Sequence, residues 1–326
     1  LPFIMYGSYI YGEIPSFAFL LFGTWMLLLT LEGETDLPPV LRALCGLLAL
    51  LSLSCGVLVR KNSLVFIIAL GIILALWLLQ NRLRLSKRKL VLWLVYFLLI
   101  FALSVGIIPM VQNLYAGRSG QRINPGIPAS TYLAMGLMET EAGPGHYSGY
   151  NFETFTQAAD YDAETASAIG WNDYQKQLSY FAAHPEYSLR FFWKKFCIQW
   201  LNTGWSVFDS TFVAFGERLP VIESCFSGPL YGVLKAYMTN YQMVLYLLCA
   251  ICTFVCFREK KDAVFLYLFP LTAFGGALLF LAWEASGRYV LPYAVFMLPC
   301  AGYGMCRLCD RAAPIFTVLW KGKKNV

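Results

Sequence analysis

Apolar runs of about 18 to 22 residues recur along this chain, and they constrain its fold more than any other feature. A helix rises about 1.5 Å per residue, so a run of this length crosses a hydrocarbon core about 30 Å thick. Hydrophobic residues make up 58% of the 326 positions and charged residues only 13%, against roughly 25% charged in soluble domains. We therefore expect an α-helical integral membrane protein and nearly exclude a soluble fold.

The runs predict about seven transmembrane helices, because backbone groups in lipid must be hydrogen-bonded within their own segment. These helices are expected at residues 13–31, 41–59, 63–80, 90–109, 236–257, 262–283 and 289–309. They divide the chain into three regions: an N-terminal bundle of four helices (1–109), a large hydrophilic loop domain (110–235), and three C-terminal helices with a basic cytoplasmic tail (236–326).

Basic residues in short loops predict the orientation of the helices, because such loops face the cytoplasm. Basic clusters lie at residues 82–89, 258–261 and 307–324. All three can face the cytoplasm only if the 110–235 loop is extracytoplasmic. The chain is thus expected to be a multi-pass protein of the cell membrane.

The 110–235 loop is expected to be mixed but mainly helical. Its first half is rich in Gly and Pro turns and carries Tyr132, His146, Tyr147, Tyr150 and Asn151, a content that suits either a binding surface or a packed scaffold. A helix is expected over 160–183 and an amphipathic one near 189–208. The second has aromatic residues at helical spacing with Lys and Arg among them, which is typical of a helix in the lipid headgroup region; the same residues could equally anchor an ordinary loop helix.

Charged residues gather at the outer ends of the predicted helices. Arg60 and Lys61 form an outward-facing cationic pair, for which a lipid phosphate is the nearest anion; the alternative is two snorkelling side chains. Glu284 and Arg288 are four residues apart and would pair on one helical face. Arg288 could then hold a phosphate with its forked donors, although a plain helix-end ion pair would look the same.

A cluster of aromatic and acidic residues precedes the first predicted helix. Tyr11 and Glu13 belong to it, and Tyr289 lies beside Arg288 at the same expected depth. Tyrosines at this level usually anchor a protein in the membrane. Aromatic rings also stack on the apolar faces of sugars, so the residues are compatible with a saccharide site.

Four stretches resemble one known family: YIYGEIPSF, LVRKNSLVFIIAL, GIPASTYLAMGL followed by GPGHYSGYN, and EASGRYVLPYAVFMLP. The chain is similar to bacterial membrane glycosyltransferases of the GT-C fold, glycosyltransferase family 39-like, which include protein O-mannosyltransferases and lipid A aminoarabinose transferases. The resemblance implies a polyprenyl-phosphate sugar as donor, with Arg288 contacting its phosphate and Arg60 and Lys61 assisting. Glu284, Tyr289, Glu13 and Tyr11 would support them.

The family's catalytic aspartate lies in the first extracytoplasmic loop, after the first membrane helix. No such loop is present in these residues, so the chain is expected to be an N-terminally truncated fragment and its catalytic residue is unassigned. Only two histidines occur and no metal-ligand cluster is visible, which leaves the need for a divalent metal open.

The expected function is sugar transfer to a glycan, lipid or protein acceptor at the outer face of the bilayer, with no nucleic-acid partner. Three alternatives are open. Another envelope polysaccharide ligase or polymerase would need the same outer loop and phosphate contacts. A transporter or flippase would need ionisable or helix-breaking residues near the span centres, which are scarce here. A non-catalytic scaffold would not need charges gathered at one depth.

Overall fold

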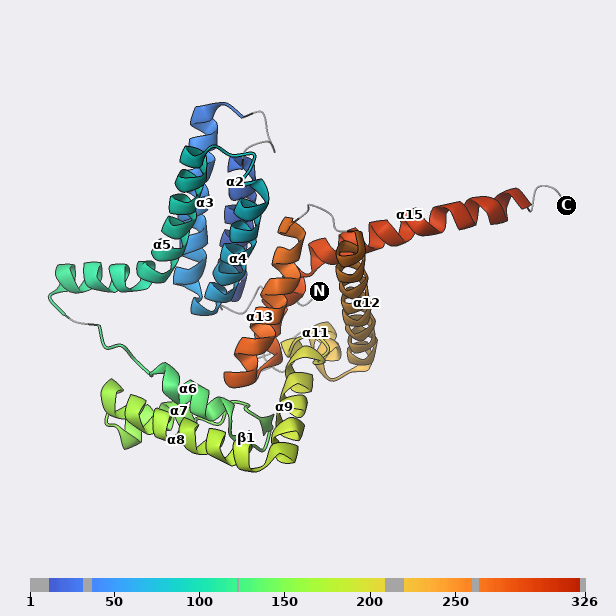
Figure 1. The fold of residues 1–326 in the computed structure, drawn as a ribbon. Helices are drawn as coiled ribbons and strands as arrows, with labels where there is room; N and C mark the ends of the chain where they lie inside the picture. Colours follow the sequence, from blue (N-terminus) through green and yellow to red (C-terminus); the bar gives the residue numbers. More distant parts are fainter. Residues whose placement is uncertain (1–11, 32–36, 122, 209–219, 260–263, 323–326) are drawn as a thin grey trace.

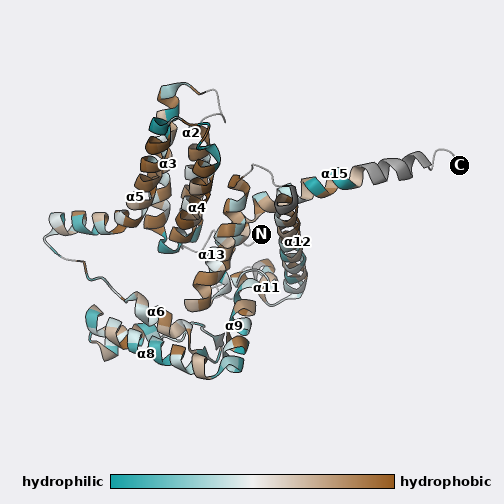
Figure 2. Ribbon diagram, in the orientation of Figure 1, coloured by the Kyte–Doolittle hydropathy of each residue, from teal (hydrophilic) through white to brown (hydrophobic). Residues whose placement is uncertain are grey.

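The computed structural model describes residues 12–31, 37–121, 123–208, 220–259 and 264–322. Within these ranges six helices are long and apolar enough to cross a membrane, and a bent pair near the C-terminus can make a seventh. Figure 2 shows their apolar surfaces, in contrast to the polar helix α8 (Ala163–Ala183). The expected α-helical membrane protein is confirmed.

Four helices form the N-terminal bundle (Figure 1): α2 (Glu13–Thr30), α3 (Pro39–Val59), α4 (Leu64–Asn81) and α5 (Lys87–Ser119). Glycines let α2 and α3 approach closely. A Cβ on Gly23 would lie 2.8 Å from Leu53 Cγ, and one on Gly56 would lie 2.8 Å from Leu20 Cδ2. Small residues at such contacts favour helix association in lipid, where dispersion rather than the hydrophobic effect drives packing.

Helix α5 continues beyond the predicted span of 90–109. Pro109 lies inside the helix, and the C-terminal part of the helix turns away from the bundle in Figure 1. Proline removes a backbone donor and crowds the preceding turn, which kinks a helix without always ending it. The helix instead ends at Gly120, whose left-handed backbone (φ 70°) suits a glycine cap.

The segment between α5 and the C-terminal helices folds into a mainly helical layer. It contains α6 (Ala129–Gly136), a two-stranded ribbon of β1 (Glu139–Thr140) and β2 (Gly143–Pro144), α7 (Tyr150–Glu153), a π-turn (Thr154–Ala158), α8 (Ala163–Ala183) and α9 (Pro185–Trp200). The predicted helix over 160–183 is α8, which begins late because Asp162 caps it by accepting the Thr165 backbone N–H at 2.8 Å.

The helix predicted near 189–208 is α9, and its expected bounds were wrong. It begins at Pro185 and ends at Trp200, where Leu201 (φ −104°, ψ 7°) leaves the helical conformation. Gly204 and Trp205 then take left-handed backbone (φ 85° and 52°), so the helix does not continue to residue 208. Its lysines also differ from the expected polar face: Lys194 is exposed but Lys195 is 0% exposed. In Figure 1 helix α9 rises toward α13 rather than crossing the ends of the membrane helices.

The C-terminal region contains α11 (Pro220–Phe226), α12 (Pro229–Glu259), a 3-10 turn (Val264–Tyr267), α13 (Leu268–Ala282), a second 3-10 turn, η4 (Gly287–Val290), α14 (Leu291–Phe296) and α15 (Leu298–Gly322). The span predicted at 289–309 is not one straight helix. The path bends by 49° between Phe296 and Leu298.

The α6–α9 layer covers one end of the bundle, where α2 begins and α3 and α13 end (Figure 1). The backbone N–H of Ala285, just after α13, donates to Gly145 O at 2.6 Å, and His146 pairs with Ala285 as a parallel bridge. The turns at residues 60–62 and 283–289 lie at the same end of the molecule as the layer and face it across one cleft.

Candidate functional site

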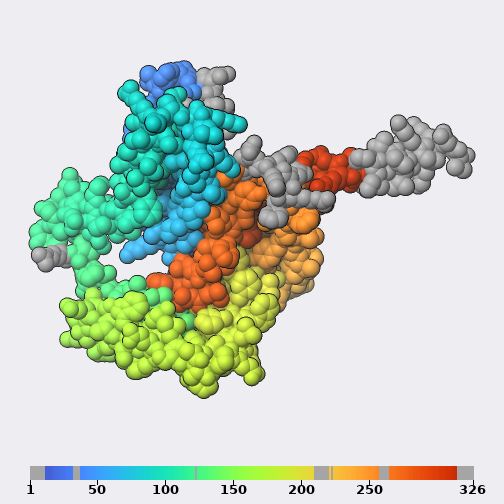
Figure 3. Space-filling model, in the orientation of Figure 1, coloured from blue at the N-terminus to red at the C-terminus, as the bar shows by residue number. Residues whose placement is uncertain are grey.

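An open cleft of about 1040 Å³ lies between the end of the membrane bundle and the α6–α9 layer. Figure 3 shows the molecule hollowed in this place. One side of the cleft carries Arg60, Lys61 and Arg288, and the other carries residues of α6 and α7. The cleft is therefore bordered by cations on the bundle side and by aromatic and amide groups on the layer side.

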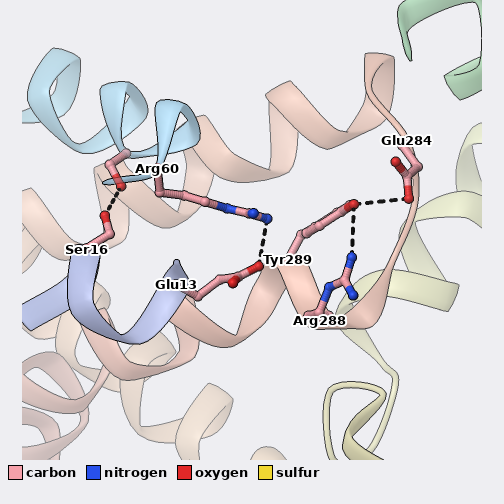
Figure 4. Close-up of polar contacts among 7 residues, drawn as sticks. Glu13, Ser16, Arg60, Glu284, Arg288 and Tyr289 are labelled. Carbon is pink, nitrogen blue, oxygen red and sulfur yellow. Dashed lines mark hydrogen bonds and ion pairs between the residues drawn. The ribbon is translucent and has the colours of Figure 1, made fainter. Parts of the chain in front are cut away.

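Arg60 follows α3 in extended backbone (φ −145°, ψ 109°), which turns its side chain across the start of α2. Its Nη2 pairs with Glu13 Oε1 at 2.6 Å, and Glu13 is 7% exposed. The guanidinium also lies over the Tyr289 ring, 5.6 Å from its centroid. Glu13 thus fixes Arg60 beneath the cleft (Figure 4), where it lines a small void of about 30 Å³.

Two serines hold the same corner together. Ser16 Oγ donates to Gly56 O at 2.7 Å and contacts Ser63 Oγ at 2.6 Å. These contacts connect α2 to the end of α3 and to the turn that bears Lys61, whose side chain is exposed. The positions of both cations therefore depend on the packing of α2 against α3.

Tyr289 connects the two residues that the sequence paired directly. Its hydroxyl donates to Glu284 Oε1 at 3.0 Å and accepts from Arg288 Nη2 at 3.3 Å (Figure 4). The expected pairing of Glu284 and Arg288 on one helical face was wrong, because Trp283 and Ser286 have extended backbone. A tyrosine hydroxyl, and not a helical turn, links the carboxylate to the guanidinium.

Glu284 is a buried acid at the cleft wall, 6% exposed. Burial raises the pKa of its carboxyl, while the Tyr289 hydroxyl and the charges of Arg288, His146 and Arg60 act in the opposite direction. Water solvates a charged carboxylate better than this pocket does, so the loss of water has the largest effect on the pKa.

This shift predicts how stability changes with pH. A carboxyl whose folded-state pKa is raised stabilises the fold below its unfolded value, near 4.5, and that contribution is lost as the pH rises through the folded value. The melting temperature of Glu284→Gln, relative to that of the wild type, should therefore increase as the pH rises above 4.5. Glu186→Gln, at a position 88% exposed, is the control. Parallel wild-type and Glu284→Gln curves would contradict the shift.

Lys195 is a site residue that sequence reasoning did not find. Its Nζ donates to Leu281 O at 2.9 Å, to Trp283 O at 2.7 Å and to Gly136 O. These carbonyls end α13 and α6, where a positive charge is favourable. Burial lowers the pKa of Lys195 to about 7, opposed by the charge of Glu284. The lysine joins the layer to the segment that carries Glu284 and Arg288.

One glycine makes room for this lysine, and another lets the end of α6 approach the end of α13. A Cβ on Gly145, which has left-handed backbone (φ 68°), would lie 2.6 Å from Lys195 Cε, and one on Gly136 would overlap the backbone of Trp283. The GPG turn and the AMG end of α6 were the only sequence signals near it, and neither indicates a buried cation.

The layer side of the cleft is aromatic. Tyr132 stacks on Trp283 with ring centroids 5.3 Å apart and planes at 5°. Tyr147 and Asn151 also line the cleft. Tyr150 does not: its hydroxyl donates to Asp173 Oδ2 at 2.7 Å. Of the loop residues that suggested a binding surface, the structure brings together all but Tyr150.

Five of the residues expected at the site line the same cleft: Arg60, Lys61, Glu284, Arg288 and Tyr289. Glu13 lies beneath it as the partner of Arg60. The expectation for Tyr11 lies outside the described residues. Within the described ranges no three His, Cys, Asp or Glu side chains are placed to hold a metal ion.

Comparison with known proteins gives no relative: no family model, no curated protein and no solved structure matches this chain.

Proposed function

We propose that the cleft is the donor site of a membrane glycosyltransferase, which moves a sugar from a polyprenyl-phosphate carrier to a glycan, lipid or protein acceptor on the outer face of the bilayer. The observation that carries the proposal is the gathering of Arg60, Lys61 and Arg288 along one cleft at the end of the membrane helices. A lipid phosphate reaches a protein at this level, and guanidinium groups bind phosphate with paired donors.

The chemistry needs cations where these lie. An acceptor hydroxyl attacks the anomeric carbon, the bond from that carbon to the phosphate oxygen breaks, and its electron pair leaves with the polyprenyl phosphate. The acceptor proton passes to a carboxylate base, which the family resemblance places in a loop after that family's first membrane helix. Arg288 stabilises the charge that develops on the leaving phosphate, and Lys61 helps to bind the donor.

The distribution of charge favours an enzyme over a transporter. In the described spans, charged residues lie near the helix ends: Glu13 begins α2, Arg42 lies in the first turn of α3, and α4 and α13 have none. Transport pathways usually need ionisable groups near the bilayer centre. Glu13, Arg60, Lys61, Glu284 and Arg288 instead gather at the cleft end of the helices.

The test is transfer of radiolabelled sugar from polyprenyl-phosphate mannose, glucose, galactose or aminoarabinose by membranes that contain the full-length protein. Incorporation of label from any of them into a lipid, glycan or protein fraction is the expected result. Membranes that take no label from any of these donors would refute the proposal.

Lys61→Ala should raise the KM for the donor about three- to tenfold with little change in kcat, since an exposed cation contributes modestly to binding. The difference should shrink as salt increases, because exposed charges are screened. Lys176→Ala on α8, at a position 67% exposed, is the matched control. An unchanged KM in Lys61→Ala would remove this residue from the donor site.

A further inference from the structure

We infer that the wall of the cleft formed by α6 and α7 is a glycosyl subsite, which receives the sugar ring while the cations opposite receive the phosphate. This inference rests on the proposed function. On this wall α6 contributes Tyr132, α7 contributes Asn151 and Phe152, and the turn before α7 contributes His146 and Tyr147. Trp283, just after α13, lies beside them.

The aromatic rings are unusually open for residues in a cleft. Tyr147 is 52% exposed and Phe152 is 55% exposed, so neither ring is used up in packing the layer. Beside them Tyr132 and Trp283 form a nearly parallel stack. Ligand sites are lined mainly by apolar and aromatic side chains with a few placed polar groups. Open rings offer the flat apolar surface on which the C–H face of a pyranose packs.

The polar groups supply the second, independent observation. Asn151 is 3% exposed, and its Oδ1 has no hydrogen-bond partner in the described part of the chain. His146 Nδ1 is likewise buried without a partner among the described residues. Buried polar atoms are almost always paired in native proteins, so two unpaired polar atoms on one cleft wall indicate a ligand with hydroxyl groups, which can both donate and accept.

The two walls together fit one molecule. The bundle side supplies the cations Arg60, Lys61 and Arg288, and the Tyr289 ring there already lies under two of them. The layer side supplies the exposed rings of Tyr147 and Phe152 and the polar side chains of His146 and Asn151. At about 1040 Å³ the cleft is larger than a phosphate alone requires. A sugar ring joined to a phosphate matches both walls, because the ring can pack on the aromatic side and the phosphate can pair with the cations. A lipid phosphate without a sugar matches only the cationic wall.

The experiment measures binding by the full chain in nanodiscs, with decaprenyl phosphate as one probe and decaprenyl-phosphate mannose, glucose, galactose or aminoarabinose as the others. Asn151→Ala should weaken binding of at least one sugar-bearing lipid about three- to tenfold, the usual range for one lost hydrogen bond, and leave decaprenyl phosphate unchanged. Asn151→Gln keeps a neutral amide oxygen and should retain part of the affinity. Asn240→Ala, at an exposed position on α12, is the matched control.

Two further variants keep the inference testable if Asn151→Ala melts early. Tyr147→Ala and Phe152→Ala change exposed rings and should lower affinity for the same sugar-bearing lipid, again with decaprenyl phosphate unaffected. Equal binding of every sugar-bearing lipid by the wild type and these variants would overturn the subsite and leave the phosphate site standing. If the wild type binds neither decaprenyl phosphate nor any of the sugar-bearing lipids, the proposed function is overturned, and the subsite with it.

Discussion

Replacing Arg288 with alanine is expected to lower the rate of sugar transfer by about two to three orders of magnitude, the cost of removing one preorganised group that stabilises charge in a transition state. Arg288 lies on the cleft and is held by the Tyr289 hydroxyl, which is itself bonded to Glu284. The effect should appear mainly in kcat, because the phosphate carries more charge as it leaves than in the bound donor.

The matched substitutions separate charge from shape. Arg288→Lys keeps the charge but loses the forked donors and the contact with Tyr289, so it should restore only part of the rate. Arg190→Ala on α9 removes an arginine that is 62% exposed and paired with Glu186, and it should leave transfer unchanged. Wild-type turnover in Arg288→Ala, measured with a radiolabelled donor in membranes, would exclude Arg288 from the reaction.

Lys195→Met is expected to cause the largest loss of stability, about 2–4 kcal/mol. Methionine fills a similar volume but leaves the carbonyls of Gly136, Leu281 and Trp283 without their shared donor. A buried charge is costly, yet removing it here leaves three buried acceptors unpaired, and that cost dominates. The melting temperature of the purified protein should fall by roughly 5 to 10 °C.

The neighbouring lysine provides the control for that experiment. Lys194 lies on the same helix but is exposed, so Lys194→Met should leave the melting temperature within about one degree of the wild type. Lys195→Met should also increase proteolysis in the α6–α9 layer, because this lysine joins the layer to α13. Equal melting of the two variants would show that the three carbonyls find other donors.

The bends of the membrane helices were less predictable than the spans. The apolar runs gave the bounds of α2, α3 and α4 within a few residues. The reason is that the ends of such a helix lie where apolar side chains, which partition into lipid, give way to polar ones. Pro109 was taken as the end of a span, but α5 passes through it. Whether a proline kinks or ends a helix depends on which neighbours satisfy the freed carbonyls, and these are not read from local sequence.

The candidate site divides in the same way. Arg60, Lys61 and Arg288 were found because charged residues at the ends of apolar runs are rare and easily seen. Lys195 was missed because it occurs in the sequence Lys194-Lys195, where helical spacing suggested a polar face. Nothing in the local pattern distinguishes the exposed lysine from the buried one, since the three acceptors of Lys195 come from residues 59, 86 and 88 positions away.

The sequence by itself determined that this protein lies in a lipid bilayer. It also gave the approximate number and bounds of the membrane helices, and the end of the bundle at which the cations of the candidate site lie. Only the tertiary structure decided which of those charges share a cleft, that Tyr289 joins Glu284 to Arg288, and that the α6–α9 layer supplies the opposite wall. The physical reason is range: partition into lipid acts on each segment separately, whereas hydrogen bonds and ion pairs act over a few ångströms between segments that the chain brings together only when folded.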